Sequence, residues 1–220
     1  MIFVNFKTYK EATATKAVDL VQHIVSVQTE TKVPIVPVVQ AVDARLCVNT
    51  SGYMVWVQHV DWQESGQTTG WVTIEGVAET GITGTFLNHS EHKLKSDKCR
   101  VISEECRKIG LETMIFASDV DELKEVVKLK PNYVAFEPPE LIASTTTSVA
   151  QAKQDEIKEA AKIAQAAGVK LIVGAGVKSK EDVETSIKLG AVGVVVSSAV
   201  ILVSNQRDVL LELASCFSKI

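Results

Sequence analysis

The sequence predicts a (β/α)8 barrel, in which eight parallel strands close into one sheet and each strand is followed by a helix. Short β-branched runs alternate with longer amphipathic stretches along all 220 residues. The ends of the short runs fall between residues 7 and 197, on average about 27 residues apart, close to the roughly 30 residues of a βαβ unit. Alternation and spacing together favour the barrel.

Eight short apolar runs are expected to form the strands. Several are apolar throughout rather than alternating, which is typical of parallel strands that are buried on both faces. In chain order they are Ile2–Asn5, Pro34–Val39, Met54–Gln58, Gly84–Asn88, Glu112–Phe116, Tyr133–Phe136, Lys170–Val173 and Val192–Val196.

The stretches between these runs carry apolar residues at helical spacing, so that each can cover one face of the sheet. Three glycines stand where such helices should end, as left-handed C-caps do. The clearest helical stretches are Ala14–Val27, Val120–Lys128, Asp155–Ala166 and Glu181–Leu189, and the glycines are Gly110, Gly168 and Gly190.

No Pro-rich or low-complexity linker interrupts the series, so a single domain over residues 1–220 is expected. The length lies near the lower limit for this fold, which requires short loops and short outer helices. An open doubly wound sheet has the same local pattern and remains the alternative.

The composition is that of a folded and slightly acidic protein. Hydrophobic residues make up 46% of the chain, and 27 acidic against 23 basic side chains give a net charge of −4. The apolar content excludes intrinsic disorder, and the charge argues against nucleic-acid binding, which needs clustered Lys and Arg. No run approaches the roughly 18 apolar residues of a membrane span, so no membrane association is expected.

The cysteines and the N-terminal run favour a cytoplasmic protein. The run from Met1 to Lys7 is too short for a signal peptide and has no basic stretch before it. Without export the thiols are expected to stay reduced, and they resemble small core hydrophobes because CxxC spacing is missing. They are Cys47, Cys99, Cys106 and Cys216.

Polar residues follow most of the expected strands, at the end where barrel enzymes place their active sites. A carboxylate there can remove a proton from carbon next to a carbonyl, and a neutral imidazole and an ammonium can stabilise the resulting enediolate. Gly/Ser turns after the last two strands match the phosphate site common in this architecture. We therefore predict proton abstraction on a phosphorylated carbonyl substrate. The residues are Asn5, Phe6 and Lys7 after the first strand, Gln58, His59 and Asp61 after the third, His89, Ser90 and Glu91 after the fourth, Glu137 after the sixth, Gly174–Gly176 after the seventh, and Ser197 and Ser198 after the eighth.

Taken singly, these residues have simpler interpretations. Lys7 could be a solvated lysine, and Glu137 could simply be held extended by the proline that follows it. The HSEH segment that begins at His89 lacks the HExxH spacing of a zinc site, and residues 174–179 match neither nucleotide-loop pattern. No metal and no cofactor are therefore expected.

Five segments resemble those of the triosephosphate isomerase family, in particular its short archaeal form. They occur in the family's order and span nearly the whole chain. They are Asn5-Phe6-Lys7-Thr8-Tyr9, Gln58-His59-Val60-Asp61, Leu87-Asn88-His89-Ser90-Glu91, Glu137-Pro138-Pro139-Glu140-Leu141-Ile142 and Gly174-Ala175-Gly176.

The resemblance implies the TIM-barrel form of the fold and interconversion of dihydroxyacetone phosphate and D-glyceraldehyde 3-phosphate without a metal or an organic cofactor. This family is itself the standard example of a glutamate base paired with a neutral histidine electrophile under a closing lid. The implied catalytic residues are Glu137 as the base, His89 as the electrophile and Lys7 as the positive charge. The implied substrate-binding residues are Asn5, Phe6, Lys7, Glu91, Ile142, Gly176, Ser197 and Ser198.

The chain departs from the family pattern at three places. The lid tip from Ala143 to Ser148 contains no glycine, the turn after the eighth strand reads Ser197-Ser198-Ala199, and Ala117 replaces a common cysteine. A lid tip that needs positive φ would be strained by about 1 kcal/mol without glycine. A catalytically weakened or silent phosphate-binding barrel is therefore the alternative, and a barrel isomerase of phosphoribosyl compounds is a further one.

A homo-oligomer, either a dimer or a tetramer, is expected because short archaeal relatives assemble in this way. The short outer helices of so small a barrel also leave apolar surface that a partner subunit could cover. Trp56, Trp62 and Trp71 are not spaced as a stacking platform, so core or subunit-interface packing is expected for them.

Overall fold

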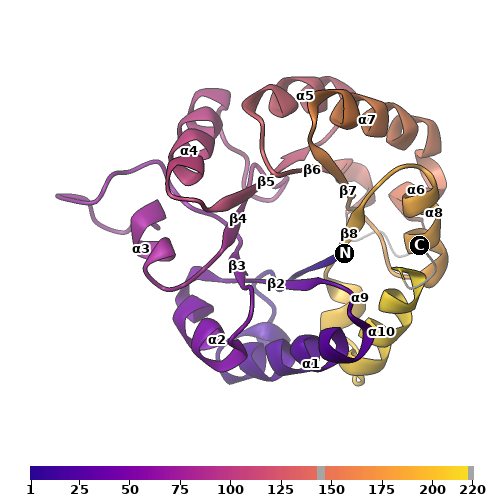
Figure 1. Cartoon of the computed structure of the whole chain (residues 1–220), viewed down its shortest axis with the longest axis horizontal. Helices are drawn as coiled ribbons and strands as arrows, with labels where there is room; N and C mark the ends of the chain where they lie inside the picture. Colours follow the sequence, from indigo (N-terminus) through magenta and orange to yellow (C-terminus); the bar gives the residue numbers. More distant parts are fainter. Residues whose placement is uncertain (143–146, 218–220) are drawn as a thin grey trace.

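The computed structural model describes residues 1–142 and 147–217, and in these residues eight parallel strands form a closed barrel. The strands follow chain order around the barrel, and β8 pairs with β1 to close it (Figure 1). This closure confirms the (β/α)8 barrel and excludes the open doubly wound sheet. The strands are β1 (Ile2–Asn5), β2 (Ile35–Val39), β3 (Trp56–Val57), β4 (Gly84–Leu87), β5 (Glu112–Ala117), β6 (Tyr133–Phe136), β7 (Lys170–Val173) and β8 (Gly193–Val196).

The strands agree with the predicted runs to within two residues at each end. β2 begins at Ile35 because Pro34 has no N–H to donate to the ladder, although its carbonyl accepts from Ile2 at 2.9 Å. β3 is the shortest of the strands, and the backbone N–H of Gln58, just after it, still donates to the Val39 carbonyl at 3.1 Å.

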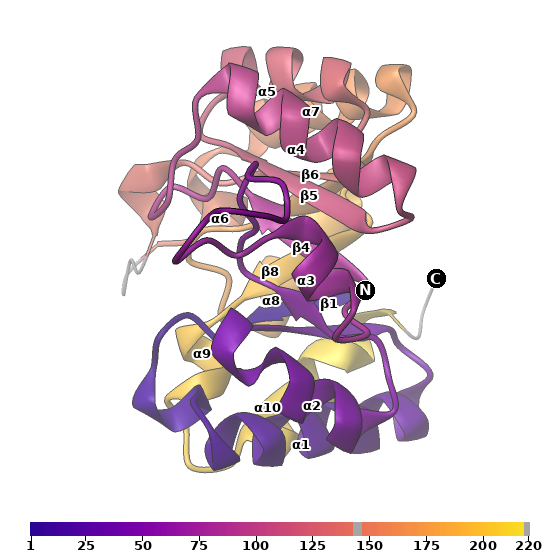
Figure 2. The same cartoon turned by 90° about the vertical axis from the view of Figure 1, so that its left-hand side faces the viewer.

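Helices surround the barrel on its outer side (Figures 1 and 2). They are α1 (Thr15–Thr31), α2 (Ala44–Ser51), α3 (Ile74–Ala78), α4 (Ser96–Lys108), α5 (Val120–Val126), α6 (Val149–Ala152), α7 (Gln154–Ala167), α8 (Lys180–Lys188), α9 (Ser198–Ile201) and α10 (Gln206–Ala214). Short 3-10 turns join some of them, namely η1 (Lys10–Ala12), η2 (Ala41–Asp43), η3 (Val127–Leu129), η4 (Pro139–Leu141) and η5 (Ser215–Phe217).

Local signals in the sequence set the helix ends. Asp119 caps α5 by accepting from the backbone of Glu122, and Ser179 forms a capping box at the start of α8. Gly168 ends α7 in the left-handed conformation, as predicted, whereas Gly110 and Gly190 take positive φ one residue after the C-caps of α4 and α8.

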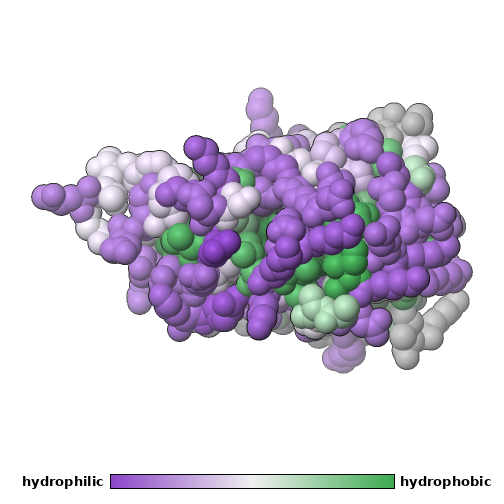
Figure 3. Space-filling model, turned by 90° about the horizontal axis from the view of Figure 1, so that it is seen from above, coloured by the Kyte–Doolittle hydropathy of each residue, from purple (hydrophilic) through white to green (hydrophobic). Residues whose placement is uncertain are grey.

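The outer helices present hydrophilic side chains to solvent, and apolar side chains show between them (Figure 3).

All four cysteines are buried and free, as predicted. Burial raises the pKa of Cys47, Cys99 and Cys106 to about 12, so these thiols stay protonated. Across the described part of the chain, a bilayer-spanning helix of sufficient length and apolarity is not found.

Aromatic rings fill the interior of the barrel. Trp56 is fully buried there and meets Phe3 and Tyr133 edge-on, at ring-centre distances of 5.0 Å and 5.8 Å. Gly84 makes this possible, because a Cβ at that position would lie 2.1 Å from the Trp56 ring. Core packing is thus confirmed for Trp56, and a glycine in a buried strand has a packing reason.

We expect Gly84→Ala to lower the free energy of unfolding by about 3 kcal/mol, because the added methyl overpacks the barrel interior. Chemical denaturation measures the change. Combining it with Trp56→Leu should cost less than the sum of the two single changes, since the methyl then fills space that the ring has left. Strict additivity would contradict this packing.

Candidate active site

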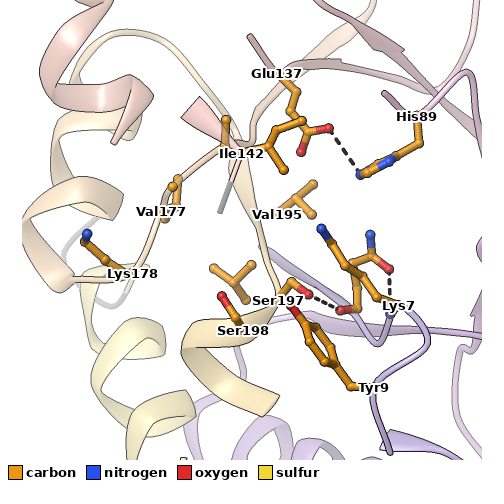
Figure 4. Close-up of a pocket in the computed structure, with 14 residues that line it drawn as sticks. Lys7, Tyr9, His89, Glu137, Ile142, Val177, Lys178, Val195, Ser197 and Ser198 are labelled. Atoms are coloured by element: carbon orange, nitrogen blue, oxygen red, sulfur yellow. Dashed lines mark hydrogen bonds and ion pairs between the residues drawn. The ribbon is translucent and has the colours of Figure 1, made fainter. Parts of the chain in front are cut away.

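A pocket that is partly open to solvent lies where the carboxyl ends of the barrel strands meet (Figure 4). It brings together most of the predicted site residues, which come from β1, β4, β6, β7 and β8. The lining residues are Asn5, Lys7, Tyr9, His89, Glu137, Ile142, Ala175, Gly176, Val177, Lys178, Val195, Val196, Ser197 and Ser198.

Two of the implied substrate-binding residues do not line this pocket. Phe6 has no exposed surface and belongs to the core between the strands and the outer helices. It shares the outer face of the first strand with Val4, because side chains alternate along a strand, whereas Asn5 and Lys7 point to the pocket side. Glu91 lies next to the pocket and reaches Lys7.

Glu137 follows β6 directly and is 6% exposed. Its backbone N–H continues the ladder by donating to Ala117 at 2.8 Å. Gly174 leaves room for its carboxylate, since a Cβ there would lie 2.9 Å from Oε1. Burial raises the pKa of Glu137 to about 7, while Lys7 and a hydrogen bond from Ser90 counteract that rise. The carboxylate is therefore suited to accept a proton near neutral pH.

His89 faces this carboxylate, with 3.2 Å between Nε2 and the Oε2 atom of Glu137 (Figure 4). Its Nδ1 accepts a hydrogen bond from the backbone N–H of Glu91 at 3.1 Å. An accepting Nδ1 places the ring proton on Nε2, toward the pocket. Burial lowers the pKa of His89 to about 4, so the imidazole is neutral at pH 7 and can donate from Nε2.

Lys7 brings a positive charge to the same pocket. Its Nζ pairs with Glu91 Oε1 at 2.7 Å, and its backbone N–H donates to Asn5 Oδ1 at 3.0 Å. Its carbonyl accepts from the side chain of Gln58 at 2.9 Å. These contacts hold Lys7 at φ +44°, a conformation that costs free energy in a residue with a side chain and is found where function requires it.

The opposite side of the pocket consists of two turns of small residues. Gly176 has φ +69°, and a Cβ there would lie 2.8 Å from the Thr147 carbonyl oxygen, so a larger residue would collide with the neighbouring backbone. Ser197 donates from its hydroxyl to the Asn5 carbonyl at 2.7 Å, which joins the turn after β8 to the first strand. Ile142 and Ser198 complete this side.

The predicted lid begins after Ile142, and its residues 143–146 lie outside the described part of the chain. At its far end Ser148 is fully buried and donates to Asp182 Oδ1 at 2.5 Å. The same carboxylate accepts from the backbone N–H of Ser179, so the end of the lid is attached to the turn after β7.

His59 and Asp61, the other polar residues predicted at the strand ends, lie beside the pocket rather than in it. They pair at 3.1 Å, and the His59 ring stacks on His92 at 4.1 Å. In residues 1–142 and 147–217, His, Cys, Asp and Glu form no group of three that could hold a metal ion.

A family model described as triosephosphate isomerase matches residues 1–116 and 98–215. The chain belongs to the triosephosphate isomerase family. Membership makes the protein an isomerase and sets aside the phosphoribosyl alternative. It gives no support to a silent barrel.

Curated triosephosphate isomerases of archaea match almost end to end. The protein of Methanocaldococcus jannaschii is 31% identical over 215 residues, which cover 97% of this chain and 98% of that relative. Those of Metallosphaera sedula and Methanopyrus kandleri are 35% and 37% identical, over 96% and 97% of this chain and 93% and 96% of their own lengths. The resemblance to the short archaeal form is confirmed.

Several pocket residues were not predicted from the sequence. Tyr9 stands in the first matching segment, two residues after Lys7, and this spacing was a usable signal. No comparable sequence signal marks Val177, Lys178 and Val195, because apolar and solvated residues next to strand ends are common in any barrel.

For this isomerase, we expect kcat/KM to rise as the pH rises through about 7 and to level off above it, because Glu137 accepts a proton only when ionised. His89, whose pKa is about 4, adds no transition above pH 5. Rate measurements between about pH 5 and about pH 9 test this, since an ordinary glutamate would ionise near pH 4.3.

The variant Lys7→Met shows whether the inflection comes from Glu137 or from the substrate phosphate. The phosphate titrates near pH 6 with the wild type and with the variant alike. Lys7 lowers the pKa of Glu137, so its removal should move the inflection to higher pH while activity falls. Lys10→Met, which changes an exposed lysine on η1, should leave the inflection in place. An inflection common to all three proteins would contradict the assignment.

Proposed function

We propose that this chain interconverts dihydroxyacetone phosphate and D-glyceraldehyde 3-phosphate, with Glu137 as the base, His89 as the electrophile and Lys7 as the stabilising cation. The observation that carries these roles is the 3.2 Å contact between Glu137 Oε2 and His89 Nε2 at the bottom of a pocket that also holds Lys7. Such an enzyme acts in glycolysis or gluconeogenesis. It needs no metal and no organic cofactor.

The reaction moves one proton between two neighbouring carbons and one proton between the oxygens that these carbons carry. The ionised Glu137 takes a proton from the carbon next to the carbonyl, and the C–H electron pair forms the double bond of an enediolate. His89 donates its Nε2 proton to the oxygen on which charge develops and takes up the proton of the neighbouring hydroxyl, so that one proton also passes from one oxygen to the other. Lys7 Nζ balances the negative charge. Glu137 then returns the proton to the neighbouring carbon, which regenerates the free base.

The two small-residue turns fit a phosphate on the substrate. Gly176 and Ser198 can offer backbone N–H groups from the turns after β7 and β8, and Ile142 borders the same space. Asn5 lies between this side and Lys7 and holds the Lys7 backbone. We therefore assign Asn5, Ile142, Gly176, Ser197 and Ser198 to substrate binding.

Glu91 orients Lys7 and His89 rather than reacting. Its carboxylate pairs with Lys7, and its backbone N–H sets the tautomer of His89. We assign to the segment from Pro138 to about Val149 the exclusion of water during the reaction, which protects an enediolate that would otherwise lose phosphate.

The test is a coupled assay with D-glyceraldehyde 3-phosphate. We expect Glu137→Gln to lower kcat by at least about a thousandfold, since general-base catalysis contributes factors of this size. Glu105→Gln is the matched control, because Glu105 is an exposed carboxylate on α4 that pairs with Lys108 away from the pocket. It should keep the wild-type rate.

A phosphorylated enediolate mimic should raise the melting temperature of the wild type, because a ligand that binds only the folded state stabilises it. An active Glu137→Gln variant would overturn the role of the base. A wild type that neither turns over substrate nor responds to the mimic would overturn the proposed substrate.

We also infer that the protein forms a homo-oligomer, either a dimer or a tetramer, in the cytoplasm. The segment between β3 and α3 projects away from the barrel and carries Trp71, which is 45% exposed and lies 5.5 Å from Trp62 between ring centres (Figure 1). Val42 and Leu46, 84% and 47% exposed, add apolar surface near α2. Such surface is typical of subunit contacts.

Sedimentation measures the assembly directly. We expect the wild type to sediment as a dimer or a tetramer, and Trp71→Glu to shift it toward the monomer, because a charge replaces a ring that a partner would cover. Val192→Glu, at an exposed valine just before β8, is the control and should not change the assembly. A monomeric wild type would contradict the inference.

A further inference from the structure

The carboxylate of Glu122, in the first turn of α5, lies outside the pocket and accepts several hydrogen bonds. Its Oε1 accepts from Asn88 Nδ2 and from Lys93 Nζ, both at 2.8 Å. Its Oε2 accepts from Lys93 Nζ at 2.9 Å and from the backbone and hydroxyl of Ser118 at 2.8 Å and 2.6 Å. The N-cap of α5 is Asp119, and the contacts of Glu122 with Asn88 and Lys93 reach outside this helix.

Two of its three partners stand in the loop that carries His89. Asn88 precedes His89 directly, and Lys93 stands four residues after it. Asn88 is itself buried, and its side chain also donates to the Phe116 carbonyl of β5 at 2.9 Å and accepts from the Leu94 backbone at 3.0 Å. Both ends of the loop from residue 88 to residue 94 are thus joined to Glu122 and to β5.

The loop is also braced internally, so that a movement at its ends reaches the imidazole. The His92 backbone N–H donates to the His89 carbonyl at 2.8 Å, and the Glu91 backbone N–H donates to the His89 ring. Asn88 has the left-handed conformation at φ +59°, which asparagine adopts more readily than most residues with a side chain. β4 and β5, with α4 and α5 outside them, lie side by side around this loop (Figure 1).

Only a carboxylate suits this position. Every group that faces Glu122 is a donor, so an amide in its place would turn an N–H2 group toward Lys93 or Ser118. Burial alone would raise the pKa of Glu122, but the hydrogen bonds from Lys93, Ser118 and Asn88 lower it to about 2. The carboxylate therefore stays ionised over the whole range in which Glu137 titrates.

We propose that Glu122 is a positioning residue for the isomerase reaction: through Asn88 and Lys93 it fixes the loop that holds the His89 imidazole against Glu137. The inference rests on the proposed role of His89. Glu122 itself touches neither the pocket nor the substrate, so its effect reaches the reaction only through the geometry of that loop.

The test compares Glu122→Gln with Asp119→Ala. Asp119 is exposed and caps the same helix, so its removal destabilises α5 without touching the bonds to the loop. We expect Glu122→Gln to lower kcat by about tenfold to a hundredfold with KM changed less than about twofold, because misplacing the electrophile affects the transition state while the phosphate turns stay intact. Asp119→Ala should keep kcat within about twofold.

A second readout follows the imidazole itself. Nitrogen NMR of the ligand-free protein should show the His89 ring proton on Nε2 alone in the wild type and in Asp119→Ala, and an altered tautomer mixture in Glu122→Gln. Should Glu122→Gln fold poorly, Asn88→Gly removes the link to Glu122 while it permits the positive φ, and the same losses are expected of it.

Wild-type kcat in both Glu122→Gln and Asn88→Gly, with an unchanged His89 spectrum, would overturn the inference and leave the proposed function standing. An inactive wild type would overturn the proposed function instead, and the NMR comparison would still decide whether Glu122 fixes His89.

Discussion

A buried carboxylate in contact with a buried neutral imidazole is the constraint on which the rest of this site depends. Glu137 and His89 are 6% and 7% exposed, whereas in open water the carboxylate would be a weaker base and the imidazole would be partly protonated at neutral pH. Burial raises the pKa of the carboxyl and lowers that of the imidazole. Both shifts therefore have one cause, and the base is made strong enough while the electrophile stays uncharged.

The interior of the barrel buries Glu137 and His89 from the side opposite the pocket opening, and several backbone conformations around the pocket are strained. The His89 ring packs edge-on against Phe116 at 4.7 Å, at the upper end of the aromatic interior. Lys7, Asn88 and Ala175 all have positive φ, although none is a glycine, and they stand at the ends of three different strands. The strands and their hydrogen bonds hold these residues in place. The backbone geometry at the pocket end of the barrel therefore lowers the net free energy of unfolding.

Position along the chain made much of this predictable. Because parallel strands end at the same side of a barrel, Lys7, His89 and Glu137 could be expected in one place although they lie far apart in the sequence. Phe6 shows the limit of that argument: a one-residue step along β1 turns a side chain from the pocket into the outer core. The role of Glu122 could not be predicted from the sequence. Its partners Lys93 and Asn88 lie 29 and 34 residues away, and only the packing of α5 against the loop after β4 brings them near.

The fit of Trp56 over Gly84 has a historical consequence. Neither position can change first without penalty, because a side chain at 84 collides with the ring and the loss of the ring opens a void in the barrel. An ancestor that carried another pair must have passed through a less stable sequence or have changed both residues together. Among the descendants of such a chain, we expect substitutions at the two positions to occur together.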